Sequence, residues 1–318
     1  MQYRRLGQSG LKISAVSLGG WLTFGSQVDE AGVKQVVAAA VDGGVNFIDL
    51  ADVYAKGEAE RVFGKALAGY RRQDLVISSK AFWPMTDNIN DRGLSRKHLF
   101  ESVEGSLRRL GTDYLDIYFC HRFDEETSVE EVVMAMDDLC RQGKILYWGT
   151  SVWTAAQITE AALTARRLGA HPPRAEQPRY NLLDRHIEPE ILPTCLAQGI
   201  GIVCWSPLGQ GLLTGKYNDG LPAGSRAGEL EWVRQGITET SVARVRRLAD
   251  VAADLGLPLG QMALAWCLRQ EGVSSVITGA RTAAQVQENL AAAELKLDEA
   301  TLARIEDIVE PAPALLKM

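Results

Sequence analysis

The hydrophobic and polar positions of this chain follow two periods that alternate along most of its length. Short apolar runs are followed by segments of ten to fifteen residues in which apolar side chains recur at the helical spacing of about 3.6. This alternation is typical of βαβ units and a parallel sheet. Turn signals at Gly7 and Ser9-Gly10 predict a β-hairpin over residues 1–14, ahead of the repeating pattern.

The apolar runs predict eight strands, which are Ala15–Leu18, Asn46–Asp49, Leu75–Lys80, Leu115–Cys120, Ile145–Thr150, Arg174–Gln177, Ile200–Trp205 and Ser274–Thr278. The helical patterns between them cover residues 30–43, 95–110, 128–142, 154–168, 187–198, 241–255 and 282–293. Two later segments, Leu257–Arg269 and Asp298–Val309, predict a helix before the last strand and a terminal helix.

Eight β/α units in 318 residues predict a single (β/α)8 TIM barrel domain over residues 1–318, with an N-terminal hairpin and extra C-terminal helices. An open doubly wound sheet is the alternative. A dinucleotide-binding sheet of that kind would carry a G-x-G-x-x-G turn after its first strand. The chain has Gly19-Gly20-Trp21-Leu22-Thr23-Phe24-Gly25 there, which does not fit. Residues 206–240 are too long for a simple connection, and we expect a lid or binding loop, or else disorder.

The composition of the chain limits the kinds of partner and the location that we expect for the protein. The formal net charge of −6 argues against a general nucleic-acid partner, and no apolar run approaches the length of about 20 residues needed for membrane insertion. The N-terminus does not resemble a secretory signal, so we expect a cytoplasmic protein. None of the five cysteines has C-x-x-C spacing, which favours buried reduced thiols over disulfides or a metal site.

Four polar residues lie where three of the predicted strands end. Asp49, Lys80 and His121 close or follow apolar runs, and Tyr54 lies five residues beyond Asp49. If the strands are parallel neighbours, these side chains converge at one end of the sheet, where a barrel carries its catalytic residues. Each residue alone has a structural explanation, but the set of four favours a catalytic function.

The chemistry of the set is proton delivery. A tyrosine has a pKa of about 10, and we expect the Lys80 ammonium to lower the pKa of Tyr54. Asp49 would pair with Lys80, and His121 would orient the same substrate oxygen. Such a set can protonate an oxygen that acquires negative charge, for example a carbonyl that receives a hydride.

Several segments resemble the aldo-keto reductase family over almost the whole chain. The resemblance is carried by Phe47-Ile48-Asp49-Leu50-Ala51-Asp52-Val53-Tyr54 and by Gly10-Leu11-Lys12-Ile13-Ser14, which leads to Leu18-Gly19-Gly20. Tyr147-Trp148-Gly149-Thr150-Ser151 and the segment from Ala265 to Val276 are most similar to the branch that contains the β subunits of voltage-gated potassium channels and their bacterial relatives.

The resemblance implies an NADPH-dependent carbonyl reductase on a (β/α)8 barrel. Tyr54 would be the general acid, Asp49 and Lys80 would tune it, and His121 would orient a small carbonyl substrate, with Trp83 lining the substrate pocket. The channel subunits carry asparagine at the position of His121. Because this chain has histidine there, as the ordinary reductases do, the resemblance favours an enzyme that turns over substrate. The alternatives are an NADP(H)-binding regulatory or scaffold subunit, and a barrel that has lost its cofactor.

The resemblance also implies a cofactor site. Its positions are Gly20, Trp21, Gln27, Asp49, Ser151, Gln177, Trp205, Ser206, Pro207, Leu208, Gly209, Gln210, Lys216, Arg226, Gly279, Arg281, Gln285, Glu288 and Asn289. Trp205 would stack on the nicotinamide and Lys216 would reach the pyrophosphate. Arg226 and Arg281 near the 2′-phosphate favour NADP over NAD.

Two positions depart from the family pattern. Val152 stands where a polar or basic residue is usual, and Gly224 replaces a tyrosine of the channel subunits. The relatives form tetramers, so a homo-oligomer is one expectation. The substrate is set by loops, and the sequence leaves it open.

Overall fold

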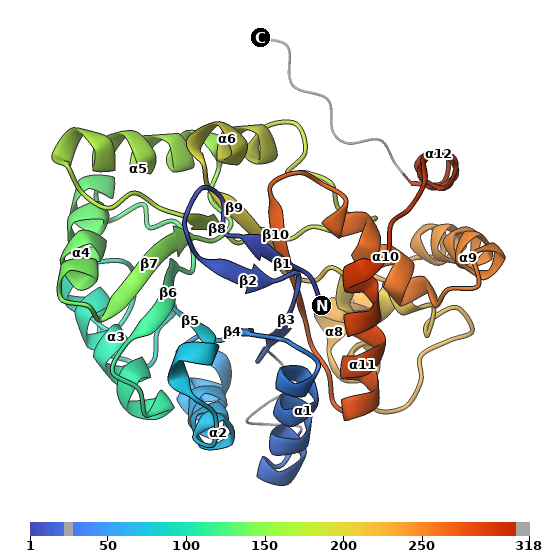
Figure 1. Ribbon diagram of the computed structural model, residues 1–318, viewed down its shortest axis with the longest axis horizontal. Helices are drawn as coiled ribbons and strands as arrows, with labels where there is room; N and C mark the ends of the chain where they lie inside the picture. The colour runs from blue at the N-terminus through green and yellow to red at the C-terminus, as the bar shows by residue number, and fades with distance from the viewer. Residues whose placement is uncertain (22–27, 310–318) are drawn as a thin grey trace.

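Eight parallel strands close into a barrel in the computed structural model, which describes residues 1–21 and 28–309 (Figure 1). Around the barrel the order is β10-β3-β4-β5-β6-β7-β8-β9, so the open sheet is excluded and the TIM barrel is confirmed. The strands are β3 Val16–Gly19, β4 Phe47–Asp49, β5 Val76–Ala81, β6 Leu115–Cys120, β7 Ile145–Thr150, β8 Ala175–Glu176, β9 Gly201–Cys204 and β10 Val273–Thr278.

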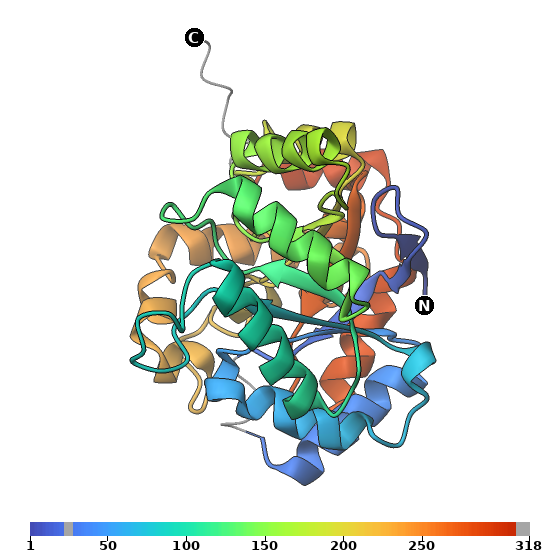
Figure 2. The same cartoon turned by 90° about the vertical axis from the view of Figure 1, so that its left-hand side faces the viewer.

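Helices cover the outside of the barrel, as the two perpendicular views show (Figures 1 and 2). The main helices are α1 Glu30–Asp42, α2 Glu58–Leu67, α3 Arg96–Leu110, α4 Val129–Arg141, α5 Ala155–Leu168, α6 Ile191–Gln198, α9 Glu239–Asp254, α10 Leu259–Leu268, α11 Ala283–Ala291 and α12 Glu299–Glu306. Short 3-10 turns are η1 Tyr54–Gly57, η2 Arg72–Asp74, η3 Gly209–Thr214 and η4 Ala292–Glu294. Leucine, valine and alanine side chains fill the layer between the helices and the strands.

The predicted hairpin closes the end of the barrel where the strands begin. Strands β1 (Tyr3–Arg5) and β2 (Lys12–Ser14) pair antiparallel and cross the barrel in Figure 1. Leu6 and Ile13 are fully buried in the apolar cluster of the barrel interior. The Ser274 hydroxyl donates a 2.9 Å hydrogen bond to the carbonyl of Arg5 at the start of β10. This plug leaves only the opposite end, where the strands finish, open for a site.

Two helix predictions need correction. Helix α2 was not predicted, although Val62, Phe63 and Leu67 are buried on one face of it. The charged residues and the glycine between them weaken the periodic signal. The helix predicted over residues 187–198 begins only at Ile191. Pro189 accounts for the delay, because proline disfavours the helical conformation in the residue before it.

The long segment 206–240 contains more structure than a simple loop. After η3 it includes the short helices α7 (Arg226–Glu229) and α8 (Glu231–Gln235), and α9 follows. Ser225 caps α7 by accepting a hydrogen bond from the Gly228 amide, at 3.2 Å. The segment is therefore ordered. Of the two expectations for residues 206–240, a lid or binding loop remains and disorder does not.

Within the described residues no single helix is long and apolar enough to cross a membrane. Helices α9 and α10 meet that length and composition only as a pair, and they are bent by 92°. All five cysteines are unpaired.

Candidate active site

The alternation of side chains along three strands places the predicted proton-delivery residues on the inside of the barrel. Phe47 and Asp49 share one face of β4, and the register places Asp49 beside Ser78 of β5. Lys80 of β5 lies beside Phe119 of β6, and His121 follows at the end of that strand. Because successive side chains of a strand point to opposite faces, these polar groups extend the apolar column of the barrel interior at its open end.

Lys80 is the centre of this group. It is fully buried, and its Nζ donates hydrogen bonds to Asp49 Oδ2 at 2.7 Å and to the carbonyl of Leu50 at 2.6 Å. A third, longer contact of 3.4 Å reaches the hydroxyl of Tyr54. Asp49 also accepts from the Ser78 hydroxyl at 2.8 Å and from Gln177 Nε2 at 2.9 Å. The ion pair is thus fully hydrogen-bonded, which buried charges require.

The expected direction of the tyrosine shift is wrong. Burial, together with the Asp49 carboxylate, raises the pKa of Tyr54 well above its usual value instead of lowering it. The Lys80 ammonium lies closer to Asp49 than to the phenol, and burial also lowers the pKa of Lys80. Tyr54 is therefore protonated at neutral pH and can act as a proton donor.

His121 lies edge-on to Tyr54, with ring centroids 5.9 Å apart and an interplanar angle of 76°. The ring of Trp83 also meets His121 edge-on, with centroids 6.4 Å apart. Burial, followed by the charges of Lys80 and Arg122, lowers the pKa of His121 well below its usual value. The imidazole is therefore neutral at physiological pH, and it can donate a hydrogen bond without carrying a charge.

The turn that carries Tyr54 is held from outside the barrel. Ala55 and Lys56 both have left-handed backbone angles, with φ of 48° and 54°, which non-glycine residues seldom adopt. Lys56 Nζ donates to the carbonyl of Pro84 at 3.4 Å, which connects this turn to the loop after β5. Asp52, fully buried just before the turn, accepts a hydrogen bond from Ser102 of α3.

These residues open into a cavity of about 700 Å³ at the end of the barrel. The predicted site residues that line it are Trp21, Asp49, Tyr54, Trp83, His121, Ser151, Gln177, Trp205, Ser206, Pro207, Leu208, Gln210, Lys216, Arg226, Gly279, Arg281, Gln285, Glu288 and Asn289. Lys80 lies behind Asp49 and Tyr54, and neither Gly20 nor Gly209 lines the cavity, whereas Gly19 does. Gln27 lies outside the described residues.

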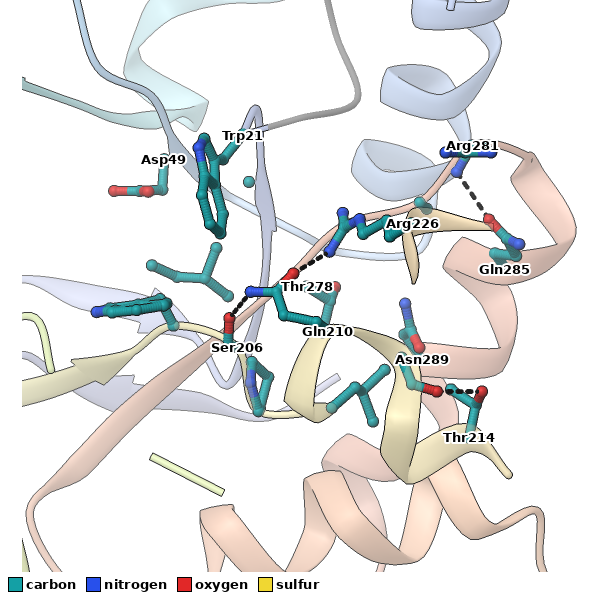
Figure 3. Close-up of a pocket in the computed structure, with 18 of the residues that line it drawn as sticks. Trp21, Asp49, Ser206, Gln210, Thr214, Arg226, Thr278, Arg281, Gln285 and Asn289 are labelled. Atoms are coloured by element: carbon teal, nitrogen blue, oxygen red, sulfur yellow. Dashed lines mark hydrogen bonds between the residues drawn. The ribbon is translucent and has the colours of Figure 1, made fainter. Parts of the chain in front are cut away.

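The cavity has two chemically different ends, and Figure 3 labels Asp49 at one of them and Arg226 with Arg281 at the other. The barrel end consists of Asp49, Tyr54, Lys80 and His121. The arginine end consists of Arg226 and Arg281, which reach the cavity from α7 and from the segment after β10. A ligand that occupies the whole cavity would meet a proton donor at one end and two guanidinium groups at the other.

Aromatic rings lie between the two ends. Trp205 follows β9, and Trp21 meets it edge-on at 6.0 Å. Trp21 also stacks on Trp232 of α8 at 5.7 Å, so the long segment closes over the cavity. Gln177 and Ser151 also line the cavity, and the Ser151 hydroxyl donates to the carbonyl of Gln177 at 2.9 Å.

The turn after Trp205 has an unusual backbone. Ser206, Gly209, Gln210 and Gly211 all have positive φ values, of 51°, 54°, 58° and 94°. Gln210 Nε2 donates to the Ser206 hydroxyl and so ties the turn together (Figure 3). A Cβ atom on Gly211 would lie 2.6 Å from Nζ of Lys216, so the glycine makes room for that ammonium at the cavity wall.

At the arginine end two like charges lie close enough to influence each other. Burial, and then the charge of Arg281, lowers the pKa of Arg226. Arg226 Nη1 donates to Gln210 Oε1 at 2.9 Å, and Arg281 Nη1 donates to the carbonyl of Gly224 at 2.7 Å. An anion of charge −2 between the guanidinium groups would relieve their repulsion. These observations fit a phosphate group.

The two departures from the family pattern have structural explanations. Gly224 has a φ of 69°, which strains any other residue, so the turn itself favours glycine over tyrosine. Val152 also has a positive φ, of 60°, and its side chain is 40% exposed and lies outside the cavity lining. Its amide donates to Oε1 of the buried Glu176 at 2.7 Å, which holds this strained residue in place.

Sequence reasoning missed part of the lining. Val53, Arg122, Thr214, Pro222, Ala223, Ser225, Gly260, Ile277 and Thr278 also face the cavity. Arg122 had a usable signal, because it directly follows His121 at the end of a strand. The residues of the long segment had none, since their place depends on how that segment folds.

Comparison with known proteins agrees with this geometry. The model of the aldo/keto reductase family matches residues 15–310. The chain is 45% identical to the probable voltage-gated potassium channel subunit beta of Arabidopsis thaliana, over 98% of each chain. It shares the same identity and coverage with the protein of that description from Oryza sativa subsp. japonica. The chain therefore belongs to the aldo/keto reductase family, whose members are generally NAD(P)-dependent oxidoreductases.

Proposed function

We propose that this protein is an NADPH-dependent carbonyl reductase that converts an aldehyde or ketone into an alcohol. One observation carries the proposal: a protonated, partly buried Tyr54 beside Lys80 and His121 shares a single cavity with the two guanidinium groups of Arg226 and Arg281. The first group suits proton donation to an oxygen, and the second suits a phosphate-bearing cofactor.

Each residue of the barrel end has a distinct task in this proposal. Tyr54 gives its proton to the substrate oxygen as negative charge develops there. Lys80, 3.4 Å from the phenol oxygen, stabilises the phenolate that remains. Asp49 fixes Lys80, and neutral His121 donates a hydrogen bond that orients the carbonyl.

The remaining cavity residues would hold the cofactor. When bound, NADPH supplies the hydride for the carbonyl carbon. Trp205 would stack on its nicotinamide, with Ser151 and Gln177 at the carboxamide. Lys216 would contact the pyrophosphate, and Arg226 with Arg281 would contact the 2′-phosphate, which NADH lacks. The cavity volume of about 700 Å³ suits a bound small molecule.

The test compares Tyr54→Phe with the wild type. We expect NADPH binding to persist, while turnover of a reactive aldehyde falls by about 10²- to 10⁴-fold, the usual contribution of a general acid. Tyr114→Phe is the matched control, because Tyr114 lies just before β6 at the closed end of the barrel. NADPH oxidation and NADPH fluorescence report the two quantities. Comparable turnover in Tyr54→Phe would overturn the assignment.

A second function is favoured by the names of the relatives. Two proteins that are 45% identical to this chain are described as probable channel β subunits. The second candidate is therefore a regulatory subunit that binds NADP(H) and associates with a channel or with copies of itself. Tight NADPH binding without turnover across a panel of aldehydes, ketones and sugar phosphates would favour that function.

A further inference from the structure

Arg122 is a cation in the cavity that the proposed mechanism does not use. It directly follows His121 after β6, and it lines the cavity. Its guanidinium carbon lies 5.7 Å from the ring centroid of Trp83, and it donates a hydrogen bond to the carbonyl oxygen of His121. Within residues 1–21 and 28–309 it forms no ion pair with a carboxylate.

Glu176 is the carboxyl group whose charge acts on Arg122. Glu176 acts on Arg122 through space, but its carboxylate accepts hydrogen bonds from the Thr150 hydroxyl and from the amides of Val152 and Trp153. Burial raises the pKa of Glu176 to about 7, so this side chain is substantially protonated near neutral pH. Glu176 therefore leaves the charge of Arg122 available to the cavity.

The barrel order separates Arg122 from the cofactor phosphates. Going round from β10, the strands are β3, β4, β5 and then β6, so β6 lies opposite β10 in the ring of eight. Arg281 follows β10, and Arg122 follows β6. An anion at Arg122 is thus a different anion from the one expected at Arg226 and Arg281.

Arg122 also lies close to the residues that would hold the reacting carbonyl. His121 and Arg122 are consecutive, so their Cα atoms are about 3.8 Å apart, and both side chains line the cavity. The charge of Arg122 acts on Tyr54 as well, where it opposes the rise in pKa caused by burial. A group held by Arg122 would lie within a few bonds of a carbonyl held by Tyr54 and His121.

We propose that the substrate is a short carbonyl compound that bears an anionic group, a carboxylate or a phosphate, which pairs with the Arg122 guanidinium beside Trp83. The proposal rests on the proposed reductase function and names its substrate class. Arginine suits both anions, because its planar fork donates two parallel hydrogen bonds to either of them.

The experiment uses substrates in pairs that differ in charge. The carboxylate pair is 4-oxobutanoate and its methyl ester, and the phosphate pair is glyceraldehyde 3-phosphate and glyceraldehyde. For each compound kcat/KM with NADPH is measured in the wild type, Arg122→Gln and Arg122→Lys. The quantity of interest is the ratio of the charged to the neutral member, which cancels general damage to the active site.

We expect the wild type to prefer the charged member of at least one pair. Arg122→Gln should lower that charged-to-neutral ratio by about 10- to 150-fold, the value of a hydrogen bond to a charged group, mainly through KM. Arg122→Lys should retain part of the preference, since it keeps the charge but loses the fork. Arg179→Gln is the control, because Arg179 lies over Trp205, pairs with Asp184 and is absent from the lining.

Each possible result supports or overturns the proposed role of Arg122. A preference confined to one pair identifies the anion as carboxylate or phosphate. Equal loss on charged and neutral members in Arg122→Gln would make Arg122 a structural support of His121 and overturn the inference, as would a wild type without charge preference. Turnover of neutral aldehydes without that preference defeats this inference alone, whereas no turnover of any carbonyl defeats the proposed function and the inference with it.

Discussion

The two ends of the cavity achieve their chemistry in opposite ways. At the barrel end, Asp49 and Lys80 belong to β4 and β5, and they are buried and fully hydrogen-bonded. At the arginine end, Arg226 lies on a four-residue helix within a long connecting segment, and Arg281 lies in a partly exposed turn. One end is part of the barrel wall, and the other is brought to the cavity by segments that lie outside the sheet.

The difference indicates which property each end needs. Proton transfer needs groups fixed in one geometry, and strands provide it because their neighbours hold them on both sides. In the proposed function a large dinucleotide has to enter before it is held, so cations on a separate segment would suit its phosphates. Trp21 and Trp232, stacked at 5.7 Å, then join that segment to the barrel.

The largest expected effect comes from breaking the barrel end at its centre. Lys80→Met removes the ammonium that supports the Tyr54 phenolate in the proposed mechanism, so turnover should fall by about 10²- to 10⁴-fold. It also leaves Asp49 charged and unpaired, which should reduce the free energy of unfolding by about 3–5 kcal/mol. Steady-state kinetics and urea unfolding measure the two effects.

A double variant separates catalysis from folding in this test. Adding Asp49→Asn to Lys80→Met removes the unpaired charge, so stability should partly recover while turnover stays low. Lys65→Met, which removes an exposed lysine paired with Glu30, is the control for lysine loss. Recovery of turnover together with stability would mean that Lys80 serves the fold and not the chemistry.

A substitution at the arginine end should change cofactor affinity and not the rate of the chemical step. Arg226→Ala removes one of the two guanidinium groups at the expected 2′-phosphate site, so affinity for NADPH should fall by about 10- to 150-fold. Affinity for NADH, which lacks that phosphate, should change little. Fluorescence titration with both cofactors measures this, and Arg234→Ala in α8 is the control, since Arg234 lies outside the cavity lining. Equal losses for both cofactors would contradict a role at the 2′-phosphate.

The sequence predicted the barrel end well and the arginine end less completely. Asp49, Lys80 and His121 could be placed together because strand periodicity fixes which residues share the inside of a barrel. The shift of Tyr54 was predicted in the wrong direction, since burial depends on the whole fold. The positions of Pro222 and Ala223 in the lining depend on how residues 206–240 fold over the cavity, and local patterns do not specify this.

A weaker effect concerns a carboxyl group next to the barrel end. The pKa of Glu176 is raised by burial to about 7 from its ordinary 4.5, so the folded state binds its proton more tightly than the unfolded state does. The stabilisation is fully present below pH 4.5 and is lost as the pH rises through about 7. Between pH 5 and pH 8 the wild type should lose on the order of 2 kcal/mol of unfolding free energy through this group.

Glu176→Gln isolates that contribution, because the amide oxygen can still accept from the Val152 amide while the group no longer titrates. The variant should therefore gain stability relative to the wild type as the pH rises from 5 to 8, and urea unfolding at both values measures the change. Glu190→Gln, on the N-cap of α6, is the matched control and should leave the pH dependence as it is. If Glu176→Gln and the wild type had the same pH dependence, Glu176 would be ionised in the folded protein. It would then compete with the proposed substrate anion for Arg122.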